Sequence, residues 1–234
     1  TGRIRDQWHT MTRTAKSARL MAHVGEPFVE VHPDDAARFG LTAASLATVS
    51  SARGSVTLRV LVTGRQQRGC VFAPIHWTGR SASEARVGAL IGGTVDPVSG
   101  QPELKYTPVG VAAFPARWFG YAVARHEPRV GTADYWAIAR AKAGWRTELA
   151  WREAPADWTA TVRGLLAPGR SEDASIIAYH DIAGAQHRFA AFEGDRLAAA
   201  LFVASSPVAV ARAYLADQLG APFAATAARY RLLA

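Results

Sequence analysis

Apolar and polar residues alternate in short runs through the first half of the chain, a pattern typical of half-buried β-strands. The clearest run covers residues 56–62, in which every second residue is valine or leucine. Pro33, followed by two aspartates and then Gly40, predicts a short helix over 33–39. The remaining pattern predicts strands over 28–31, 46–50, 70–77 and 106–114, a turn at 52–55 and a second short helix over 81–90. Several short strands with little helix favour a compact β-barrel.

The second half of the chain predicts a mixture of helices and strands. Helices are expected over 133–143, 158–167, 207–219 and 222–233, and strands over 147–151, 176–180, 187–193 and 197–204. A polar stretch over 125–132, which contains a proline and a glycine, is typical of a linker. The sequence therefore predicts two domains, a β-barrel over residues 1–120 and a smaller α+β domain over residues 121–234.

Composition is that of an ordinary globular protein and narrows the protein class only slightly. The 234 residues are 49% hydrophobic and 20% charged, which is enough to bury a core without disulfides or metal ions. The longest apolar run, 197–204, is too short to span a bilayer and no signal peptide is apparent, so we expect a cytoplasmic protein with no membrane contact. The single cysteine, Cys70, is expected to be a buried, inert thiol within a strand.

The formal net charge of +8 and the isoelectric point near 10.2 indicate an anionic partner. A nucleic acid, an acidic protein surface or a phosphate-bearing cofactor would each meet this requirement. The basic residues are spread along the chain, so a disordered nucleic-acid tail is not expected. A basic β-barrel that binds RNA or another polyanion is an alternative, although no ribonucleoprotein motif accompanies it.

The seven histidines do not follow a known metal-ligand spacing. His180 and Asp181 are neighbours in a predicted strand, where their side chains point to opposite faces, so they make a poor catalytic pair. A glycine-rich loop of the Rossmann or P-loop type is also absent from the sequence. We therefore expect neither metal ligands nor catalytic residues in this chain, and no direct NAD or ATP site.

The opening segment, residues 1–13, combines groups that bind phosphate with groups that bind flat rings. Its hydroxyls and backbone N–H groups can donate to phosphate oxygens, and its arginines can hold them bidentately. Gly2 would let the backbone approach a ligand closely, and Trp8 offers a flat face for a ring. The plain alternative is a surface arm with a partly buried tryptophan.

The same segment, with Thr1-Gly2-Arg3, Trp8-His9-Thr10 and Thr12-Arg13, resembles the start of the C-terminal domain of the dimethyl sulfoxide reductase family. These enzymes carry bis-molybdopterin guanine dinucleotide. The resemblance continues in order over residues 1–114, through the stretches 30–36 (EVHPDDA), 51–55 (SARGS), 72–77 (FAPIHW) and 96–105 (DPVSGQPELK). It implies a six-stranded double-psi β-barrel. The last stretch is most similar to the assimilatory nitrate reductase branch, and residues 134–234 are similar to the extension that follows the barrel in those enzymes.

The resemblance also implies which residues bind the cofactor. The opening segment would line the dinucleotide, a His-Trp pair would lie near the pterin, and a later Gln–Lys loop would reach the cofactor. The expected contacts are Thr1, Gly2, Arg3, Gln7, Trp8, His9, Thr10, Thr12, Arg13, His76, Trp77, Gly88, Gln101 and Lys105. Gly88 stands where many relatives have asparagine, so that contact is either lost or made by the backbone.

The resemblance further implies that this chain is only part of an enzyme. In the family the molybdenum ligand and the cysteines of the Fe–S cluster lie upstream, and one cysteine cannot hold a cluster. We therefore expect the chain to bind molybdopterin guanine dinucleotide (Mo-bis-MGD) with the remainder of the molybdoenzyme chain, to support reduction of nitrate to nitrite, and to be inactive alone. An NADH-linked reductase, a ferredoxin or a flavodoxin would donate electrons. Formate dehydrogenase and other family members are alternatives.

Overall fold

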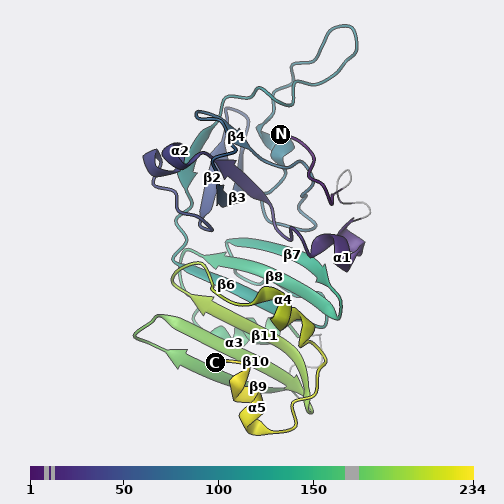
Figure 1. The fold of residues 1–234 in the computed structure, drawn as a ribbon, viewed down its shortest axis with the longest axis vertical. Coiled ribbons are helices and arrows are strands. Elements are labelled where there is room, and N and C mark those ends of the chain that lie inside the picture. Colours follow the sequence, from purple (N-terminus) through teal and green to yellow (C-terminus); the bar gives the residue numbers. More distant parts are fainter. Residues whose placement is uncertain (8–10, 12–13, 167–173) are drawn as a thin grey trace. The chain divides into compact units, whose positions relative to one another are not determined.

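The computed structural model describes residues 1–234 except 8–10, 12–13 and 167–173, and the described residues form two β-sheets with short helices (Figure 1). The prediction of a mainly β chain with some helices is confirmed. The chain divides into two compact units: the first comprises Thr1–Ala15 and Glu26–Pro115, and the second comprises Lys16–Gly25 and Ala116–Ala234. Within the described part of the chain, every helix is too short or too polar to cross a membrane.

The first unit is built on a mixed five-stranded sheet with the order β4-β1-β3-β2-β5. β1 and β3 run parallel, whereas the other neighbouring pairs are antiparallel. Side chains of alternating positions, such as Leu58 and Val60 of β3, are buried and form the core. The strands are β1 (Phe28–Val31), β2 (Leu46–Ser50), β3 (Ser55–Val62), β4 (Val71–Phe72) and β5 (Gly110–Ala113).

The sequence pattern located these strands unevenly. The strands predicted over 28–31, 46–50 and 56–62 are confirmed as β1, β2 and β3. The runs predicted over 70–77 and 106–114 are reduced to β4 and β5. Pro74 and Pro108 lie inside those runs, and proline has no N–H to donate to a neighbouring strand. The described strands of this unit form a five-stranded sheet, and the six-stranded double-psi barrel stays a prediction.

The helix predicted over 33–39 is confirmed as α2 (Pro33–Arg38). Pro33 occupies its first turn, and the His32 side chain caps it by accepting a hydrogen bond from the Asp34 N–H at 3.1 Å. Gly40, with a φ of 63°, follows the end of the helix in the left-handed conformation that favours glycine. Local capping residues were therefore sufficient to predict this helix.

The prediction of a second helix in this unit, over 81–90, is wrong. Only a short 3₁₀ turn, η3 (Val87–Leu90), is present in that stretch. Glu84 has a φ of 39°, and its carbonyl accepts a hydrogen bond from the Thr57 N–H at 3.0 Å. The segment is thus bonded to β3, and the positive φ interrupts any helix.

The second unit contains a six-stranded antiparallel sheet with the order β7-β8-β6-β11-β10-β9. Four short helices accompany its described residues, of which α1 (Ala18–Met21) lies near the start of the chain and three lie within residues 116–234. The strands are β6 (Trp118–Ala124), β7 (Tyr135–Ala141), β8 (Gly144–Trp151), β9 (Ser175–Asp181), β10 (Gln186–Glu193) and β11 (Arg196–Ala204). The three later helices are α3 (Trp158–Gly164), α4 (Arg212–Asp217) and α5 (Thr226–Arg231).

The largest error of the sequence analysis in this unit is the helix predicted over 133–143, which is strand β7. Its alanine-rich composition favours a helix, but the segment pairs along its whole length with β8. Backbone pairing and burial of its alternating apolar side chains outweigh the local propensity. The helices predicted over 207–219 and 222–233 are also too long, because only α4 and α5 are helical.

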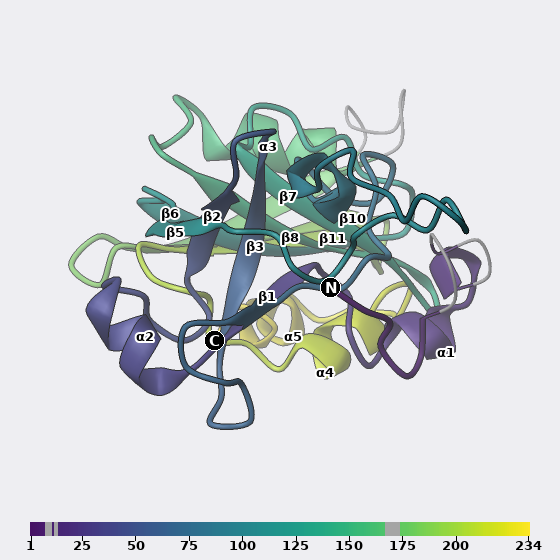
Figure 2. The same cartoon turned by 90° about the horizontal axis from the view of Figure 1, so that it is seen from above.

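Both faces of the second sheet are covered by hydrophobic cores. On one face, Trp151, Phe189 and Leu201 pack with Val162 and Leu165 around α3. On the other face, a core that includes Tyr121, Phe192, Leu197, Leu215 and Leu219 packs against α4. Figure 2 shows α3 on one side of this sheet and α4 and α5 on the other. The central strand β11 is consequently buried along nearly its whole length.

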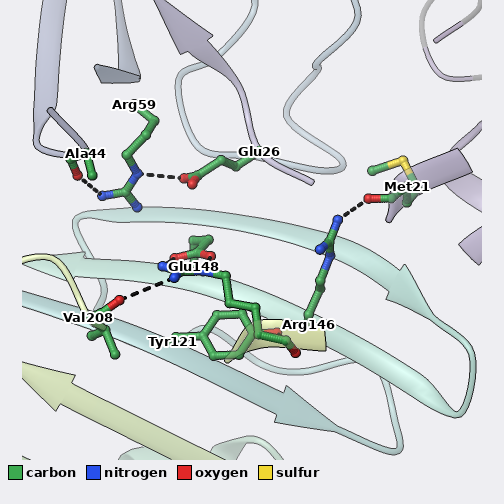
Figure 3. Close-up of polar contacts among 9 residues, drawn as sticks. Met21, Glu26, Ala44, Arg59, Tyr121, Arg146, Glu148 and Val208 are labelled. Carbon is green, nitrogen blue, oxygen red and sulfur yellow. Dashed lines mark hydrogen bonds and ion pairs between the residues drawn. The ribbon is translucent and has the colours of Figure 1, made fainter. Parts of the chain in front are cut away.

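The short segment Lys16–Gly25 belongs to the second unit although it lies near the start of the chain. It contains α1 (Ala18–Met21), which packs against β7. The Arg146 guanidinium of β8 donates a hydrogen bond to the Met21 carbonyl, as Figure 3 shows. A Cβ atom on Gly25 would collide with the same guanidinium. These contacts, which the sequence did not predict, anchor the segment to the second sheet.

Candidate functional site

The opening residues of the chain lie beside the stretch that follows β4. Gly2 and Pro74 form a parallel β-bridge, and the Ile75 N–H donates to the Gly2 carbonyl at 3.1 Å. The Ile4 N–H donates to Nε2 of His76, also at 3.1 Å, across a sequence separation of 72 residues. Two stretches that contain predicted site residues, 1–4 and 74–76, are therefore held side by side by backbone and side-chain hydrogen bonds.

A third predicted stretch meets the same opening residues. The Thr1 hydroxyl donates to the Leu104 carbonyl at 2.7 Å. Lys105 follows Leu104 directly in the chain. Residues 1–4, 74–76 and 104–105 thus converge in the first unit, and we call this region the junction.

Gly2 has little space around it at the junction. A Cβ atom added there would lie 3.0 Å from Cε2 of Phe72, in β4. Glycine therefore lets the opening residues pack closely against the aromatic ring of Phe72. The sequence predicted that Gly2 would let the backbone approach a ligand. Among the described residues, Gly2 instead lies close to Phe72.

His76 and Trp77 are both completely buried, and their rings meet edge to face with centroids 6.3 Å apart. Because His76 accepts the Ile4 hydrogen bond through Nε2, its lone pair on that atom holds the opening segment in place. The Trp77 indole N–H is buried without a hydrogen-bond acceptor among the described residues. Buried indole N–H groups usually have an acceptor, so the Trp77 N–H is an unsatisfied donor among the described residues.

Gln7 and Met11 show that the opening segment folds back on the first unit. Gln7 is buried and its Oε1 accepts a hydrogen bond from the Thr14 hydroxyl at 2.5 Å. Met11 is also buried, with a φ of 56°, and its sulfur lies 3.7 Å from the Ser81 hydroxyl. Arg3, in contrast, is exposed. Trp8, His9, Thr10, Thr12 and Arg13, also predicted as cofactor contacts, lie outside the described residues.

Gln101 lies at the end of the projecting loop between η3 and β5 (Figure 1). Asp96 orders this loop, because its Oδ1 accepts hydrogen bonds from the Ser99 N–H at 2.7 Å and the Ser99 hydroxyl at 2.8 Å. These bonds lower the pKa of the Asp96 carboxyl. Gln101 itself is exposed, and its carbonyl accepts from the Asp96 N–H at 2.9 Å.

Gly88 and Lys105 are exposed as well. Gly88 lies in η3, with open space where a side chain would begin. Lys105 lines a cavity of about 670 Å³ together with Arg38, Phe39, Cys70 and Val71. The volume falls within the range of small-molecule sites, and the two cations suit an anionic group.

Cys70 is exposed on this cavity, so the prediction of a buried thiol is wrong. The sequence analysis placed Cys70 inside a strand, but β4 begins one residue later. Leu104 and Phe72 were not among the predicted site residues. Leu104 acts through a backbone carbonyl and Phe72 through packing, and neither role has a local sequence pattern.

The donor chemistry of the first unit fits a dinucleotide with phosphate and ring groups. The exposed Arg3 guanidinium and Lys105 ammonium can donate to phosphate oxygens, and the buried Trp77 N–H can donate to a ring acceptor. Trp151, in the second unit, has a similarly buried indole N–H. The unpaired indole of Trp77 therefore supports a ligand only in combination with the converging segments of the junction.

Comparison with known proteins agrees with this geometry. Residues 1–108 match the family described as molydopterin dinucleotide binding domain. The chain is 40% identical over 157 residues to a nitrate reductase of Klebsiella oxytoca, covering 67% of this chain and 18% of that protein. It is 36% identical over 111 residues to the assimilatory nitrate reductase catalytic subunit of Bacillus subtilis, covering 47% and 15% of the two chains.

The similarity is not restricted to nitrate reductases. An F420-dependent formate dehydrogenase subunit alpha of Methanocaldococcus jannaschii is 34% identical over 111 residues, covering 47% of this chain and 16% of that protein. The chain spans less than a fifth of the length of these relatives. Among solved structures, acetylene hydratase from Pelobacter acetylenicus is 15% identical with a TM-score of 0.41, over 48% of this chain and 18% of that chain, which is too distant to define the fold.

Proposed function

Since residues 1–108 belong to the molydopterin dinucleotide binding domain family, we propose that this chain binds molybdopterin guanine dinucleotide within a longer enzyme that reduces nitrate to nitrite. The observation that carries the proposal is the junction, where residues 1–4, 74–76 and 104–105 converge. Family membership confirms the resemblance noted from the sequence. The substrate and the form of the cofactor are parts of the proposal.

We assign different tasks to the proposed cofactor contacts. Arg3 and Lys105 meet the phosphate oxygens, because both are exposed cations of the first unit. Trp77 donates its indole N–H to the ligand, whereas His76 positions the opening segment through Ile4. The bound cofactor supplies two-electron chemistry at molybdenum, and the chain supplies binding and orientation. The other proposed contacts are Thr1, Gly2, Gln7, Trp8, His9, Thr10, Thr12, Arg13, Gly88 and Gln101.

The rest of the proposal follows the family resemblance. The first unit closes into a six-stranded double-psi barrel, the second unit forms a separate domain, and the cofactor is the bis-molybdopterin guanine dinucleotide form. The remainder of the molybdoenzyme contributes the metal ligand and the Fe–S cysteines, so that the 234-residue chain alone is inactive. An NADH-linked reductase, a ferredoxin or a flavodoxin delivers the electrons.

Nitrate is favoured over formate because one nitrate reductase aligns beyond the cofactor-binding region, although the Bacillus subtilis nitrate reductase aligns over 111 residues, the same length as the formate dehydrogenase subunit. The Klebsiella nitrate reductase aligns over 157 residues, which is longer than the 108-residue range of the family match. The formate dehydrogenase subunit alpha aligns over 111 residues. Similarity that extends beyond the cofactor-binding region supports a nitrate-reducing relative, and formate dehydrogenase is the second candidate.

The test is cofactor retention by the full-length protein that contains this chain. Lys105→Ala and Arg3→Ala each remove a charge-assisted hydrogen bond worth about 1.5–3 kcal/mol, so we expect affinity for the dinucleotide to fall about ten- to hundredfold. Pterin fluorescence after oxidative release, together with guanine nucleotide content, measures retention. Lys142→Ala, at an exposed lysine between β7 and β8, is the matched control.

Two outcomes would contradict the proposal at different levels. Undiminished pterin and guanine in both variants would show that the junction does not hold the dinucleotide. The expected loss of pterin and guanine, combined with dye-linked turnover of formate but not of nitrate, would support the cofactor assignment. It would contradict nitrate as the substrate. Salt-sensitive binding of RNA by a pterin-free protein would favour the polyanion-binding alternative.

A further inference from the structure

The hairpin formed by β9 and β10 carries a pair of histidines that face each other. His180 and His187 are direct partners in the antiparallel register, so their side chains leave the same face of the sheet. Their Nδ1 atoms are 2.9 Å apart, and their ring centroids are 5.1 Å apart. The contact is exposed, which makes both rings accessible to a solute.

Aromatic side chains hold the two imidazoles in place. The His187 ring is tilted against Trp118 and Trp158, at centroid distances of 5.5 and 6.0 Å. The His180 ring meets the edge of Phe189 at 5.4 Å. Trp118, Trp158 and Phe189 belong to one core of the second unit, so the pair sits at the border of a rigid hydrophobic cluster.

The charged neighbours of the pair are engaged elsewhere. Asp181 follows His180 in β9, and its carboxylate accepts a hydrogen bond from the Gly184 N–H at 2.8 Å. Arg188 follows His187 in β10 and donates to the Leu233 carbonyl at 2.6 Å. Adjacent residues of a strand point to opposite faces, so both charges leave the face that carries the histidines.

Two Nδ1 atoms at this separation cannot both carry a proton. Either one ring donates to the other, or both lone pairs share an electrophile. A neutral imidazole is the form that binds transition metals.

We propose that His180 and His187 chelate a divalent transition-metal ion through their Nδ1 atoms, with Cu²⁺ as the preferred occupant. Metal–imidazole bonds of about 2.0–2.1 Å that meet at a right angle place the nitrogens about 2.9 Å apart, whereas tetrahedral bonds need about 3.3 Å. The observed 2.9 Å therefore fits the tetragonal geometry of Cu²⁺ or Ni²⁺ better than the tetrahedral geometry of Zn²⁺.

Two ligands leave the other coordination positions of the metal to water. Among the described residues, no group of three or more histidine, cysteine, aspartate or glutamate side chains is arranged to hold a metal. The proposed site is therefore an open, surface-accessible chelate. Both histidines belong to the second unit, whereas the proposed cofactor contacts belong to the first unit.

Copper titration of the full chain tests the proposal. We expect one Cu²⁺ per chain, an electron paramagnetic resonance spectrum with hyperfine splitting from two nitrogens, and quenching of tryptophan fluorescence because Trp118 and Trp158 lie beside the pair. His180→Asn and His187→Asn should each weaken Cu²⁺ binding at least about tenfold. His126→Asn, at an exposed histidine after β6, is the matched control and should have no effect.

Thermal melts without metal establish that the variants are folded. An equal loss of Cu²⁺ affinity in His126→Asn, or undiminished binding in both pair variants, would overturn the proposal. So would a spectrum with fewer than two nitrogen ligands in the parent chain. Zn²⁺ should compete with Cu²⁺ only in large excess, and displacement at equal concentration would contradict the tetragonal assignment.

Discussion

The two units of this chain use β-structure in different ways. The second unit has strands of 7 to 9 residues in one antiparallel sheet, with a hydrophobic core on each face. The first unit has strands of 2 to 8 residues, and its connecting segments carry the proposed cofactor contacts. Regular pairing thus stabilises one unit, whereas the proposed ligand contacts of the other unit lie in irregular segments.

Some basic residues of each unit bind the protein's own backbone. In the second unit, several arginines donate to backbone carbonyls and hold helices and chain ends against the sheet, namely Arg146, Arg188, Arg196, Arg212 and Arg229. In the first unit, Arg59 likewise donates to the Ala44 carbonyl at 2.9 Å, whereas Arg3 and Lys105 are exposed. Several of the arginines that contribute to the net charge of +8 therefore have a structural role. The net charge alone is a poor indicator of a polyanion partner.

The largest expected effect is the loss of an aromatic side chain from a core of the second unit. Phe192 is fully buried and its ring lies 5.7 Å from that of Phe223. Phe192→Ala should lower the free energy of unfolding by about 3–5 kcal/mol, measured by urea denaturation. Val98→Ala, at a residue that is 94% exposed in the first unit, should change it by less than about 0.5 kcal/mol. Equal effects of the two variants would contradict the assignment of Phe192 to a stabilising core of the second unit.

An intermediate loss of unfolding free energy is expected where an ion pair holds α4 against the sheet. Arg212 donates to both carboxylate oxygens of Glu148, at 2.6 and 3.1 Å, and lies over the Tyr121 ring (Figure 3 shows Glu148 and Tyr121). Arg212→Met leaves the Glu148 carboxylate, which is 12% exposed, without this partner. The expected loss is about 2 kcal/mol, less than for a fully buried pair because the Arg212 side chain is 37% exposed.

A double-mutant cycle sharpens this second comparison. Adding Glu148→Gln to Arg212→Met should cost less than the sum of the two single variants, because the unpaired carboxylate is removed. Arg152→Met, at an exposed arginine 3.8 Å from Asp134, is the control and should cost at most about 1 kcal/mol. Strict additivity in the Arg212 cycle would show that the ion pair does not stabilise α4.

The smallest effect on stability is expected at Gly2, where function should change instead. Gly2→Ala introduces a Cβ atom 3.0 Å from Phe72 and should shift the opening segment, at a cost below about 1 kcal/mol in unfolding free energy. Cofactor content of the full-length protein should fall. Gly64→Ala is the control, because the corresponding Cβ meets no atom within 4 Å. Unchanged cofactor content in Gly2→Ala would separate the junction from cofactor binding.

The sequence by itself determined the features that depend on short-range patterns. The two-residue period located β1, β2 and β3, and Pro33, the two aspartates that follow it and Gly40 located α2. Motif order along the first half identified the family. These patterns are readable because a period or a cap acts through residues only a few positions apart.

Tertiary structure alone decided the features that depend on distant partners. Pairing with β8 made a strand of the alanine-rich β7 segment, and Arg146 anchored residues near the start of the chain to the second sheet. The sequence listed His180 and His187 without relating them, and the antiparallel register of β9 and β10 brought their Nδ1 atoms to 2.9 Å. Such contacts follow from strand register and chain packing, which no local pattern of residues encodes.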